Sequence, residues 1–140
     1  MTAVAPGGRS LLAGLLGQGV GPSLTPALHE REGRRHGLQY VYKRVELTGE
    51  DLRPEYLRHL LAAAVHLGFD GLNVTHPVKQ VMVDLVDELD PQVAAIGALN
   101  TILIRDGVTL GHNTDVTGFA RALADGLPGA SLQHVVLLGA

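Results

Sequence analysis

The sequence predicts an α/β fold, a three-layer α/β/α domain whose sheet is mostly parallel and contains one antiparallel strand. Apolar runs typical of strands alternate with helical patterns, which favours parallel strands covered by helices on both faces. One pair of runs breaks this alternation, because the Asp106-Gly107 dipeptide between them is a strong hairpin signal and a hairpin is antiparallel. With 140 residues, of which 46% are hydrophobic, the chain is long enough to bury one core.

The first two strands and the helix between them are predicted from turn residues and apolar runs. Residues 11–16 are apolar and bounded by glycines, as expected of a strand buried on both faces. Thr25-Pro26 supplies a helix N-cap followed by proline in the first turn, and Gly37 ends that helix. Residues 39–45 alternate enough to predict the second strand, with Tyr40, Val41, Tyr42 and Val45 as its apolar or aromatic positions.

The middle of the chain repeats the pattern. A helix is predicted over 54–67, with leucines on one face and Gly68 at its end. Residues 70–74 are predicted as the third strand. A further helix is predicted from about Pro77, with its apolar side chains toward the core, and it is interrupted at Asp90-Pro91.

The last part of the chain is predicted as a hairpin, a helix and a final strand. The hairpin strands cover 99–104 and 108–110, and the helix covers 116–123. A linker-like stretch with proline and glycine follows at 126–131. Residues 134–140 then have the apolar character of a buried strand that begins a new unit.

Two glycine-containing segments are candidates for phosphate-binding loops. The strand at 134–140 runs into Gly139, which is how a dinucleotide-binding unit begins, although a simple C-terminal strand is the alternative. The run G-Q-G-V-G after the first strand has Pro22 where the last glycine of such a loop is expected. No acidic residue ends the predicted second strand, where a ribose ligand would be needed. We interpret this run as a flexible turn that lets the backbone approach a small ligand.

Composition narrows the classes of partner. The net charge is −3 and the eleven lysines and arginines are scattered, so no nucleic acid partner is expected. The absence of cysteine excludes disulfides and thiolate metal sites and fits a reducing compartment. No apolar run reaches the roughly 18 residues needed to span a bilayer, so no membrane contact is expected. We predict a soluble cytoplasmic protein.

The seven histidines do not predict a metal site. His29 and His36, like His59 and His66, are seven residues apart, roughly 10 Å along a helix, which is too far for one zinc ion. Ser23 also lies outside the G-x-S-x-G motif of serine hydrolases. We therefore expect no bound metal and no serine nucleophile.

Compact polar side chains follow several of the predicted strands. Ligands of open parallel sheets bind beyond the carboxyl ends of the strands, where hydroxyl and amide groups suit a small polyhydroxylated acid. The candidates are Ser23, Thr25, Asn73, Thr75, Lys79, Asn100, Asn113, Thr114 and Asp115. The alternative is that they are caps and turn formers, and for Thr25, Thr75 and Thr114 taken separately capping is the favoured interpretation.

Lys79 is one of only two lysines, and it follows the strand-ending turn N-V-T-H-P-V-K. In the first turn of a helix its ammonium would oppose the helix dipole, which suggests an anionic or proton-accepting partner, with a solvated surface lysine as the alternative. An aspartate such as Asp115 within about 4 to 6 Å would keep it protonated and oriented. That suits proton donation during carbonyl reduction, whereas alcohol oxidation needs the neutral amine. The sequence leaves this conflict open.

Four motifs occur in one order along the chain, S-L-T-P-A-L-H at 23–29, N-V-T-H-P-V-K at 73–79, G-A-L-N-T at 97–101 and G-H-N-T-D-V-T-G-F at 111–119. Together they resemble the shikimate dehydrogenase family. The resemblance implies an NAD- or NADP-dependent oxidoreductase that interconverts 3-dehydroshikimate and shikimate in the shikimate pathway of aromatic amino acid biosynthesis. It also implies a substrate-binding catalytic domain at 1–126, followed at 127–140 by a linker and the first strand of a truncated Rossmann cofactor domain.

The resemblance further implies a role for each matching residue. Ser23 and Thr25 would hold the substrate carboxylate, and Thr75, Asn100 and Asp115 would bind ring hydroxyls. Lys79, which also binds substrate, would form the catalytic pair with Asp115. Gly139 would begin the cofactor loop.

Two features are similar to the branch of the family that also oxidises quinate and prefers NAD. They are Thr25, where family members usually have serine, and the run Tyr42-Lys43-Arg44. The expected small-molecule partners are thus shikimate, quinate or their 3-dehydro forms. Because the printed chain stops where the family's glycine-rich loop continues, we expect the isolated chain to be inactive. The alternative is a stand-alone binding module or inactive remnant, and exposed apolar surface in either case favours a homo-oligomer.

Overall fold

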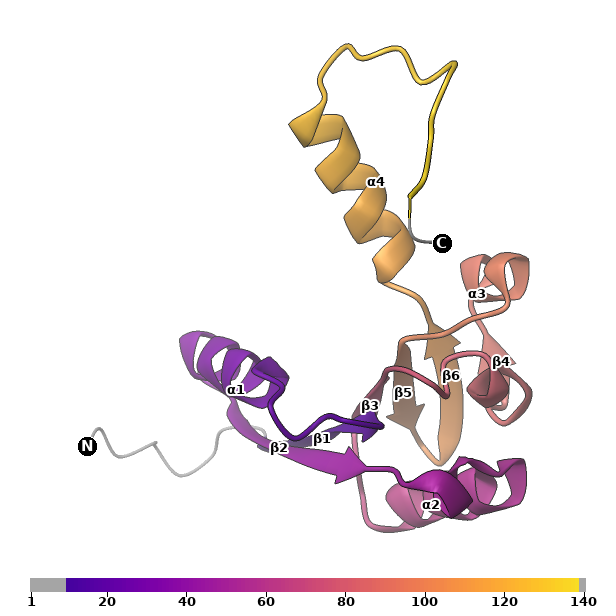
Figure 1. Ribbon diagram of the computed structural model, residues 1–140. Coiled ribbons are helices and arrows are strands. Elements are labelled where there is room, and N and C mark those ends of the chain that lie inside the picture. The colour runs from indigo at the N-terminus through magenta and orange to yellow at the C-terminus, as the bar shows by residue number, and fades with distance from the viewer. Residues whose placement is uncertain (1–9, 139–140) are drawn as a thin grey trace.

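The computed structural model describes residues 10–138, which contain one six-stranded sheet in the order β2-β1-β3-β5-β6-β4 (Figure 1). The strands are β1 (Ser10–Gly17), β2 (Gln39–Glu46), β3 (Gly71–Val74), β4 (Glu88–Leu89), β5 (Thr101–Arg105) and β6 (Val108–His112). β1 pairs in parallel with β2 and β3, and β4 pairs in parallel with β6. β5 is antiparallel to both of its neighbours. This confirms the predicted sheet, mostly parallel with β5 as the one reversed strand among the described residues.

Helices lie on both sides of this sheet (Figure 1). They are α1 (Thr25–Arg35), α2 (Pro54–His66), α3 (Pro91–Ile96) and α4 (Asp115–Gly126), with short 3₁₀ helices η1 (Gly49–Leu52) and η2 (Val81–Asp84). Proline occupies the first turn of α1, α2 and α3, where its missing N–H has no helical partner to lose. Gly37 and Gly68 have positive φ angles just after α1 and α2, as their predicted role in ending those helices requires.

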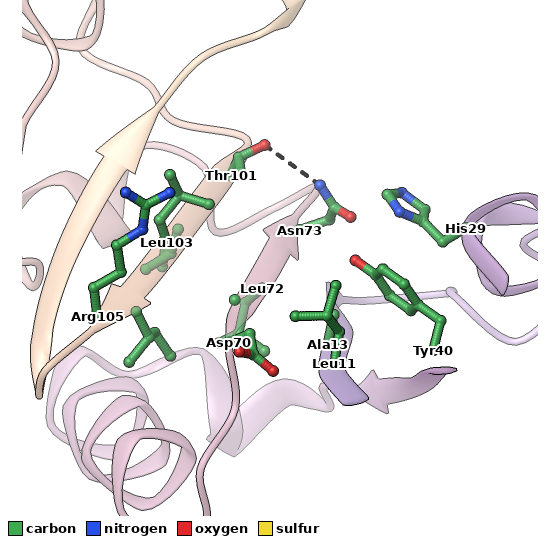
Figure 2. A pocket seen from close by; sticks show the side chains of 13 residues that line it. Leu11, Ala13, His29, Tyr40, Asp70, Leu72, Asn73, Thr101, Leu103 and Arg105 are labelled. Atoms are coloured by element: carbon green, nitrogen blue, oxygen red, sulfur yellow. Dashed lines mark hydrogen bonds between the residues drawn. The ribbon is translucent and has the colours of Figure 1, made fainter. Parts of the chain in front are cut away.

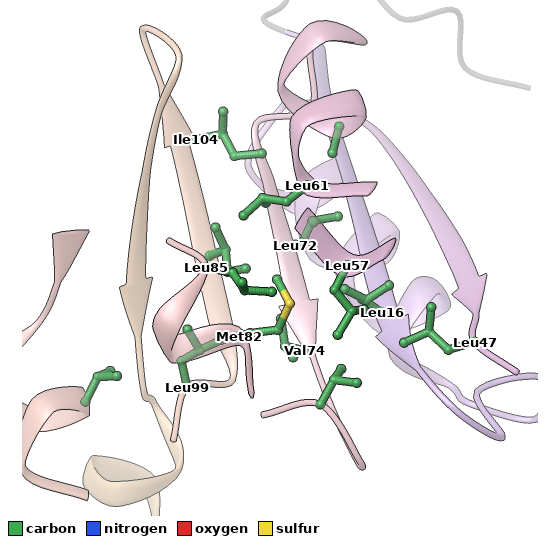
Figure 3. Packing of buried hydrophobic residues seen from close by; sticks show 14 residues of the cluster. Leu16, Leu47, Leu57, Leu61, Leu72, Val74, Met82, Leu85, Leu99 and Ile104 are labelled. Atoms are coloured by element: carbon green, nitrogen blue, oxygen red, sulfur yellow. The ribbon is translucent and has the colours of Figure 1, made fainter. Parts of the chain in front are cut away.

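The main core lies between α2 and the sheet (Figure 3). Leu57 of α2, Leu16 of β1 and Ile102 of β5 are at most 1% exposed. Each such fully buried side chain contributes about 1.5 to 3 kcal/mol from burial. A smaller cluster on the α1 side contains Ala13, Leu15, Val20 and Tyr42. β1 is buried from Ala13 to Gly17, which confirms the prediction of a strand covered on both faces.

The helix predicted from Pro77 is wrong. The chain instead turns and forms only η2, because the carbonyl oxygen of Lys79 accepts a hydrogen bond from the backbone N–H of Leu99 (3.0 Å). The amide of Val83, which would have bonded that oxygen in a helix, donates to the carbonyl of Gln80. Because this helix is absent, the interpretation that Lys79 opposes a helix dipole is wrong as well. The core assignment still holds, since Met82 is fully buried.

The sequence patterns did not predict β4 or α3. β4 extends the sheet beside β6, and α3 begins at the Asp90-Pro91 pair, whose proline predicts only the interruption of a preceding helix. The Asp90 side chain caps α3 by accepting a hydrogen bond from the N–H of Gln92 (2.9 Å), and Gly97 ends it in the left-handed conformation. The cap and stop signals were therefore present in the sequence, around a helix of only six residues.

The strand predicted at 134–140 is absent from the described residues up to 138. Val136 and Leu138 are 83% and 88% exposed, and the segment has no regular structure. A strand exists only where a neighbouring strand pairs with it, and no described strand lies beside this segment. Gly139 lies outside the described residues.

Candidate functional site

The candidate residues lie where several segments meet at one edge of the sheet. The segments after β1, β3 and β6 reach this edge because these strands run in the same direction. β5 runs in the opposite direction, so Asn100, immediately before it, lies at the same edge. The backbone of Asn100 links the two neighbouring strand ends, because its carbonyl accepts from Val74 (2.7 Å) and its N–H donates to His112 (3.0 Å).

Lys79 and Asp115 form an ion pair across 36 positions of sequence. The Lys79 Nζ lies 2.6 Å from Asp115 Oδ2, and the two side chains are 34% and 59% exposed. The hydrogen bond from Lys79 lowers the pKa of Asp115, partial burial opposes this, and a bond from Asn100 lowers the pKa further. A pair as exposed as this stabilises the fold by at most about 1 kcal/mol. Its consequence is therefore orientation of the ammonium and not stability.

Asn100 is fixed by four hydrogen bonds. Its Oδ1 accepts from the Thr101 hydroxyl (2.9 Å) and from the Thr114 N–H (3.0 Å). Its Nδ2 donates to Asp115 Oδ1 (2.8 Å) and to Thr114 Oγ1 (2.9 Å). Because two donors point at Oδ1, the amide cannot be reversed without placing its NH₂ group against them. Asn100 thus holds the second oxygen of the carboxylate that pairs with Lys79.

The network continues into the α1 side of the sheet. The Tyr42 hydroxyl donates to Asn73 Oδ1 (2.6 Å), and Asn73 Nδ2 donates to Thr101 Oγ1 (3.3 Å), as Figure 2 shows for the second bond. Burial, followed by the nearby Tyr40, raises the pKa of Tyr42, so its hydroxyl stays protonated as a donor. Asn73 and Thr101 also line a hollow of about 320 Å³ on this face. The site candidates drawn from the sequence omitted Tyr42 and Thr101 from this network, although the alternation of β2 and the G-A-L-N-T motif contain them.

Ser23 and Thr25 lie together at the start of α1. The Ser23 hydroxyl donates to Thr25 Oγ1 (3.0 Å), and it accepts from the N–H of Thr25 (3.2 Å). Both residues line a pocket of about 300 Å³ whose wall also includes Gln18, Gly19 and Thr75. Clefts of this size are within the range that holds small ligands. Thr75 connects this pocket to the Lys79 region, because Val78 N–H donates to the Thr75 carbonyl in the turn between them.

The capping interpretation of the three threonines is wrong. Thr25 is the first residue of α1 and Thr114 precedes α4, but neither side chain caps its helix, and no α-helix follows Thr75. Asn113 has the capping role instead, with its Oδ1 accepting from the N–H groups of Asp115 (2.9 Å) and Val116 (3.4 Å). The three threonine side chains are therefore not accounted for by helix capping.

The glycine-rich loop after β1 also differs from its interpretation. β2 ends one residue later than predicted, on Glu46, so an acidic residue does end this strand. The Glu46 carboxylate accepts hydrogen bonds from the N–H groups of Gly19, Val20 and Gly21. These donors are therefore not free for a phosphate, and the loop is not a flexible turn but a tethered one.

Residues 10–138 contain neither a candidate metal site nor a membrane-spanning helix. Between residues 10 and 138, no three side chains of His, Cys, Asp or Glu gather to hold a metal ion. None of the helices in that range has the length and apolar character to cross a membrane.

Comparisons with known proteins converge on one family. Residues 15–102 match the family model described as the shikimate dehydrogenase substrate binding domain. The chain is 54% identical over 131 residues to the NADP(+) shikimate dehydrogenase of Streptomyces avermitilis, covering 94% of this chain and 45% of that protein. It is 49% identical over 132 residues to the NAD(+) quinate/shikimate dehydrogenase of Corynebacterium glutamicum strain R, covering 94% and 47%.

A solved structure gives the same result for the fold. The quinate dehydrogenase of Corynebacterium glutamicum, in complex with NAD, superposes with a TM-score of 0.79 at 47% identity, over 89% of this chain and 44% of that one. The chain thus spans slightly less than half the length of the relatives it matches.

Proposed function

Because this chain belongs to the family of shikimate dehydrogenase substrate-binding domains, we propose that its strand-end site binds shikimate for NAD- or NADP-dependent interconversion with 3-dehydroshikimate. The observation that carries the proposal is the contact of 2.6 Å between Lys79 Nζ and Asp115 Oδ2, beside the fixed amide of Asn100. These groups present a proton donor and two hydrogen-bonding groups at one point. That combination suits a ring hydroxyl which becomes a carbonyl.

Each site residue has a role in this proposal. Ser23 and Thr25 bind the ligand carboxylate through their hydroxyls, and Thr75, Asn100 and Asp115 bind ring hydroxyls. Lys79 gives a proton to the carbonyl oxygen when the ketone is reduced and takes the hydroxyl proton when the alcohol is oxidised. Asp115 orients the Lys79 ammonium toward that oxygen through their contact of 2.6 Å.

The cofactor is the part of the proposal that the described residues do not fit. NAD or NADP would supply or accept the hydride, but the one glycine-rich loop among residues 10–138 that resembles a phosphate loop has its N–H groups bonded to Glu46. We therefore propose that the nicotinamide nucleotide binds outside residues 10–138, in the cofactor domain that the family resemblance implies.

Quinate is proposed as a second ligand of the same site. The relative named quinate/shikimate dehydrogenase is 49% identical to this chain, and the relative named shikimate dehydrogenase is 54% identical. Sequence identity therefore does not decide between shikimate alone and both ligands. Titration of the chain with shikimate and with quinate separates them directly. Saturable binding of both supports the broader assignment, and binding of shikimate alone restricts it.

The test of the proposal is a calorimetric titration of the 140-residue chain with shikimate. We expect saturable heat for the unaltered chain and for Lys43→Ala, which removes the only other lysine. We expect weaker binding for Lys79→Ala. Equal affinity of all three proteins would contradict the assignment of Lys79 to the site.

A stand-alone binding module is the competing function, and turnover distinguishes it. The purified chain is incubated with shikimate and either NAD or NADP, and the absorbance of the reduced cofactor is followed. We expect no reduction by this chain. Reduction by a longer protein that contains it would support the dehydrogenase assignment, whereas binding without reduction by that longer protein would support the module.

We also propose a cytoplasmic location and a homo-oligomer for this protein. A cysteine-free chain with dehydrogenase relatives fits a cytoplasmic enzyme. Val135, Val136, Leu137 and Leu138 are at least 70% exposed, which supports burial of this segment against other protein, including a second copy. Sedimentation velocity over a range of concentrations tests the homo-oligomer, and a constant monomer mass would contradict it.

A further inference from the structure

The loop that carries Ser23 is tied to the end of β2 by a single carboxylate. Glu46 Oε2 accepts from the N–H groups of Val20 (2.9 Å) and Gly21 (3.2 Å), and Glu46 Oε1 accepts from the N–H of Gly19. Three successive backbone donors that converge in this way form an anion-binding concavity, and here the anion belongs to the chain itself. Gly19 has a φ of +69°, a conformation that glycine adopts without strain.

The rest of the loop is held at two further points. The Val20 side chain is 3% exposed and packs in the α1-side core cluster, and its carbonyl accepts from the N–H of Ser23 (3.1 Å). Arg44, also on β2, donates to the Ser23 carbonyl (2.7 Å). A buried anchor and two charged residues of one strand therefore fix the backbone immediately before the Ser23 and Thr25 hydroxyls.

We propose that Glu46 is a positioning residue that orders the loop at 18–23 so that the Ser23 and Thr25 hydroxyls can bind the carboxylate of the ligand. The inference rests on the proposed function of this pocket. Glu46 does not itself line that pocket. Because Glu46 already occupies the backbone N–H groups of residues 19–21, it also directs the ligand carboxylate to the hydroxyls and away from those N–H groups.

Electrostatic repulsion and loop positioning predict opposite changes in ligand affinity when Glu46 is replaced. A carboxylate near the binding site of an anionic ligand repels that ligand, so neutralising it should tighten binding if electrostatics were its only influence. Positioning predicts weaker binding, since a glutamine has one acceptor oxygen and its NH₂ group would face backbone donors. The sign of the change in affinity therefore separates the two.

The test measures shikimate affinity of the 140-residue chain by calorimetry for Glu46→Gln, with Glu50→Gln as the matched control. Glu50 is an exposed glutamate of η1 whose ion pair is with Arg53, on the surface. We expect roughly tenfold weaker binding for Glu46→Gln, the scale of one charged hydrogen bond, and no change for Glu50→Gln. Unchanged or tighter binding by Glu46→Gln overturns the proposal.

A second ligand distinguishes positioning of the carboxylate site from a general loss of structure. Methyl shikimate lacks the ligand charge, so the unaltered chain should bind it more weakly than shikimate. In Glu46→Gln the ratio of the two dissociation constants should shrink toward one. A general loosening of the fold would weaken both ligands equally and leave the ratio unchanged, which counts against positioning.

A measurement without ligand keeps the inference separate from the proposed function. Amide hydrogen exchange and ¹H–¹⁵N shifts are compared for Gly19, Val20, Gly21 and Ser23 in the three proteins. We expect faster exchange and shifted signals at these residues in Glu46→Gln only. If the unaltered chain binds no shikimate, the proposed function fails for this chain, and this comparison alone decides whether Glu46 orders the loop. Unchanged exchange rates and shifts of these amides in Glu46→Gln would overturn the proposal that Glu46 orders the loop.

Discussion

Around Lys79 the side chains of the candidate site bond to one another, whereas around Ser23 the site is held through its backbone, by the side chains of Glu46 and Arg44. Asp115 receives hydrogen bonds from Lys79 and Asn100, and the network continues through side chains to Tyr42. The loop before Ser23 is instead tied through its N–H and carbonyl groups. The first half should therefore respond to changes of single functional groups. The second should respond to the loss of Glu46, which ties the loop, and to changes in space and backbone conformation.

The largest expected effect is on the backbone-held half, at Gly17. A Cβ at this position would lie 2.3 Å from the Thr75 Cγ2 and 2.9 Å from the His76 carbonyl oxygen. Gly17→Ala should lower the free energy of unfolding by about 1 to 3 kcal/mol, as overpacking does, because β1 and the 75–76 turn must separate. Urea denaturation measures it.

Gly21→Ala is the control for this prediction. The same substitution there meets no atom within 4 Å and leaves the N–H that bonds Glu46 in place. Its stability should stay within about 1 kcal/mol of the unaltered chain. Equal destabilisation by both substitutions would mean that contact with Thr75 is not the cause.

The next effect is on the side-chain-held half, at Tyr42. Tyr42→Phe removes the donor to Asn73 Oδ1 and leaves that part-buried acceptor without this bond, which should lower the free energy of unfolding by about 1 to 2 kcal/mol. Tyr56→Phe, at an exposed tyrosine of α2, should have no measurable effect. Thermal unfolding compares the two variants. Equal melting temperatures would show that the hydrogen bond from Tyr42 does not stabilise the fold.

Asp115→Asn tests the same half through binding. The substitution keeps the shape of the side chain but removes the charge that holds the Lys79 ammonium, so shikimate affinity should fall roughly tenfold. Asp125→Asn, near the other end of α4, is the control and should bind as the unaltered chain does. A titration with matching affinities for both variants would show that the ion pair does not orient the ligand.

The smallest effect is a change in titration. Since Lys79 lowers the pKa of Asp115, the ion pair is fully formed above the ordinary carboxyl value of 3.8 and is lost only as pH falls through the lowered pKa. Lys79→Met should raise the pKa of Asp115 toward 3.8. Carboxyl ¹³C shifts followed between about pH 2 and 6 measure it, and an identical midpoint in both proteins would show that Lys79 is not the cause.

Residue patterns predicted the larger elements well because their signals are local. Gly37 and Gly68 ended α1 and α2 where expected, and Asp106-Gly107 formed the hairpin that reverses β5. The helix from Pro77 failed because a distant residue, Leu99, takes the hydrogen bond that the helix needed. α3 was not predicted because six residues are too few to show a helical period in the sequence.

Residue patterns along the chain predicted most of the strands and helices, the family resemblance and the polar residues that follow the strands, since these depend on neighbouring residues. Which of those residues meet depends on how the strands pair in the folded sheet. The fold joined Lys79 to Asp115, turned the Asn100 amide toward Asp115 and set Glu46 against the loop after β1. Such pairs depend on strand register and direction, which bring together residues tens of positions apart and leave no local pattern.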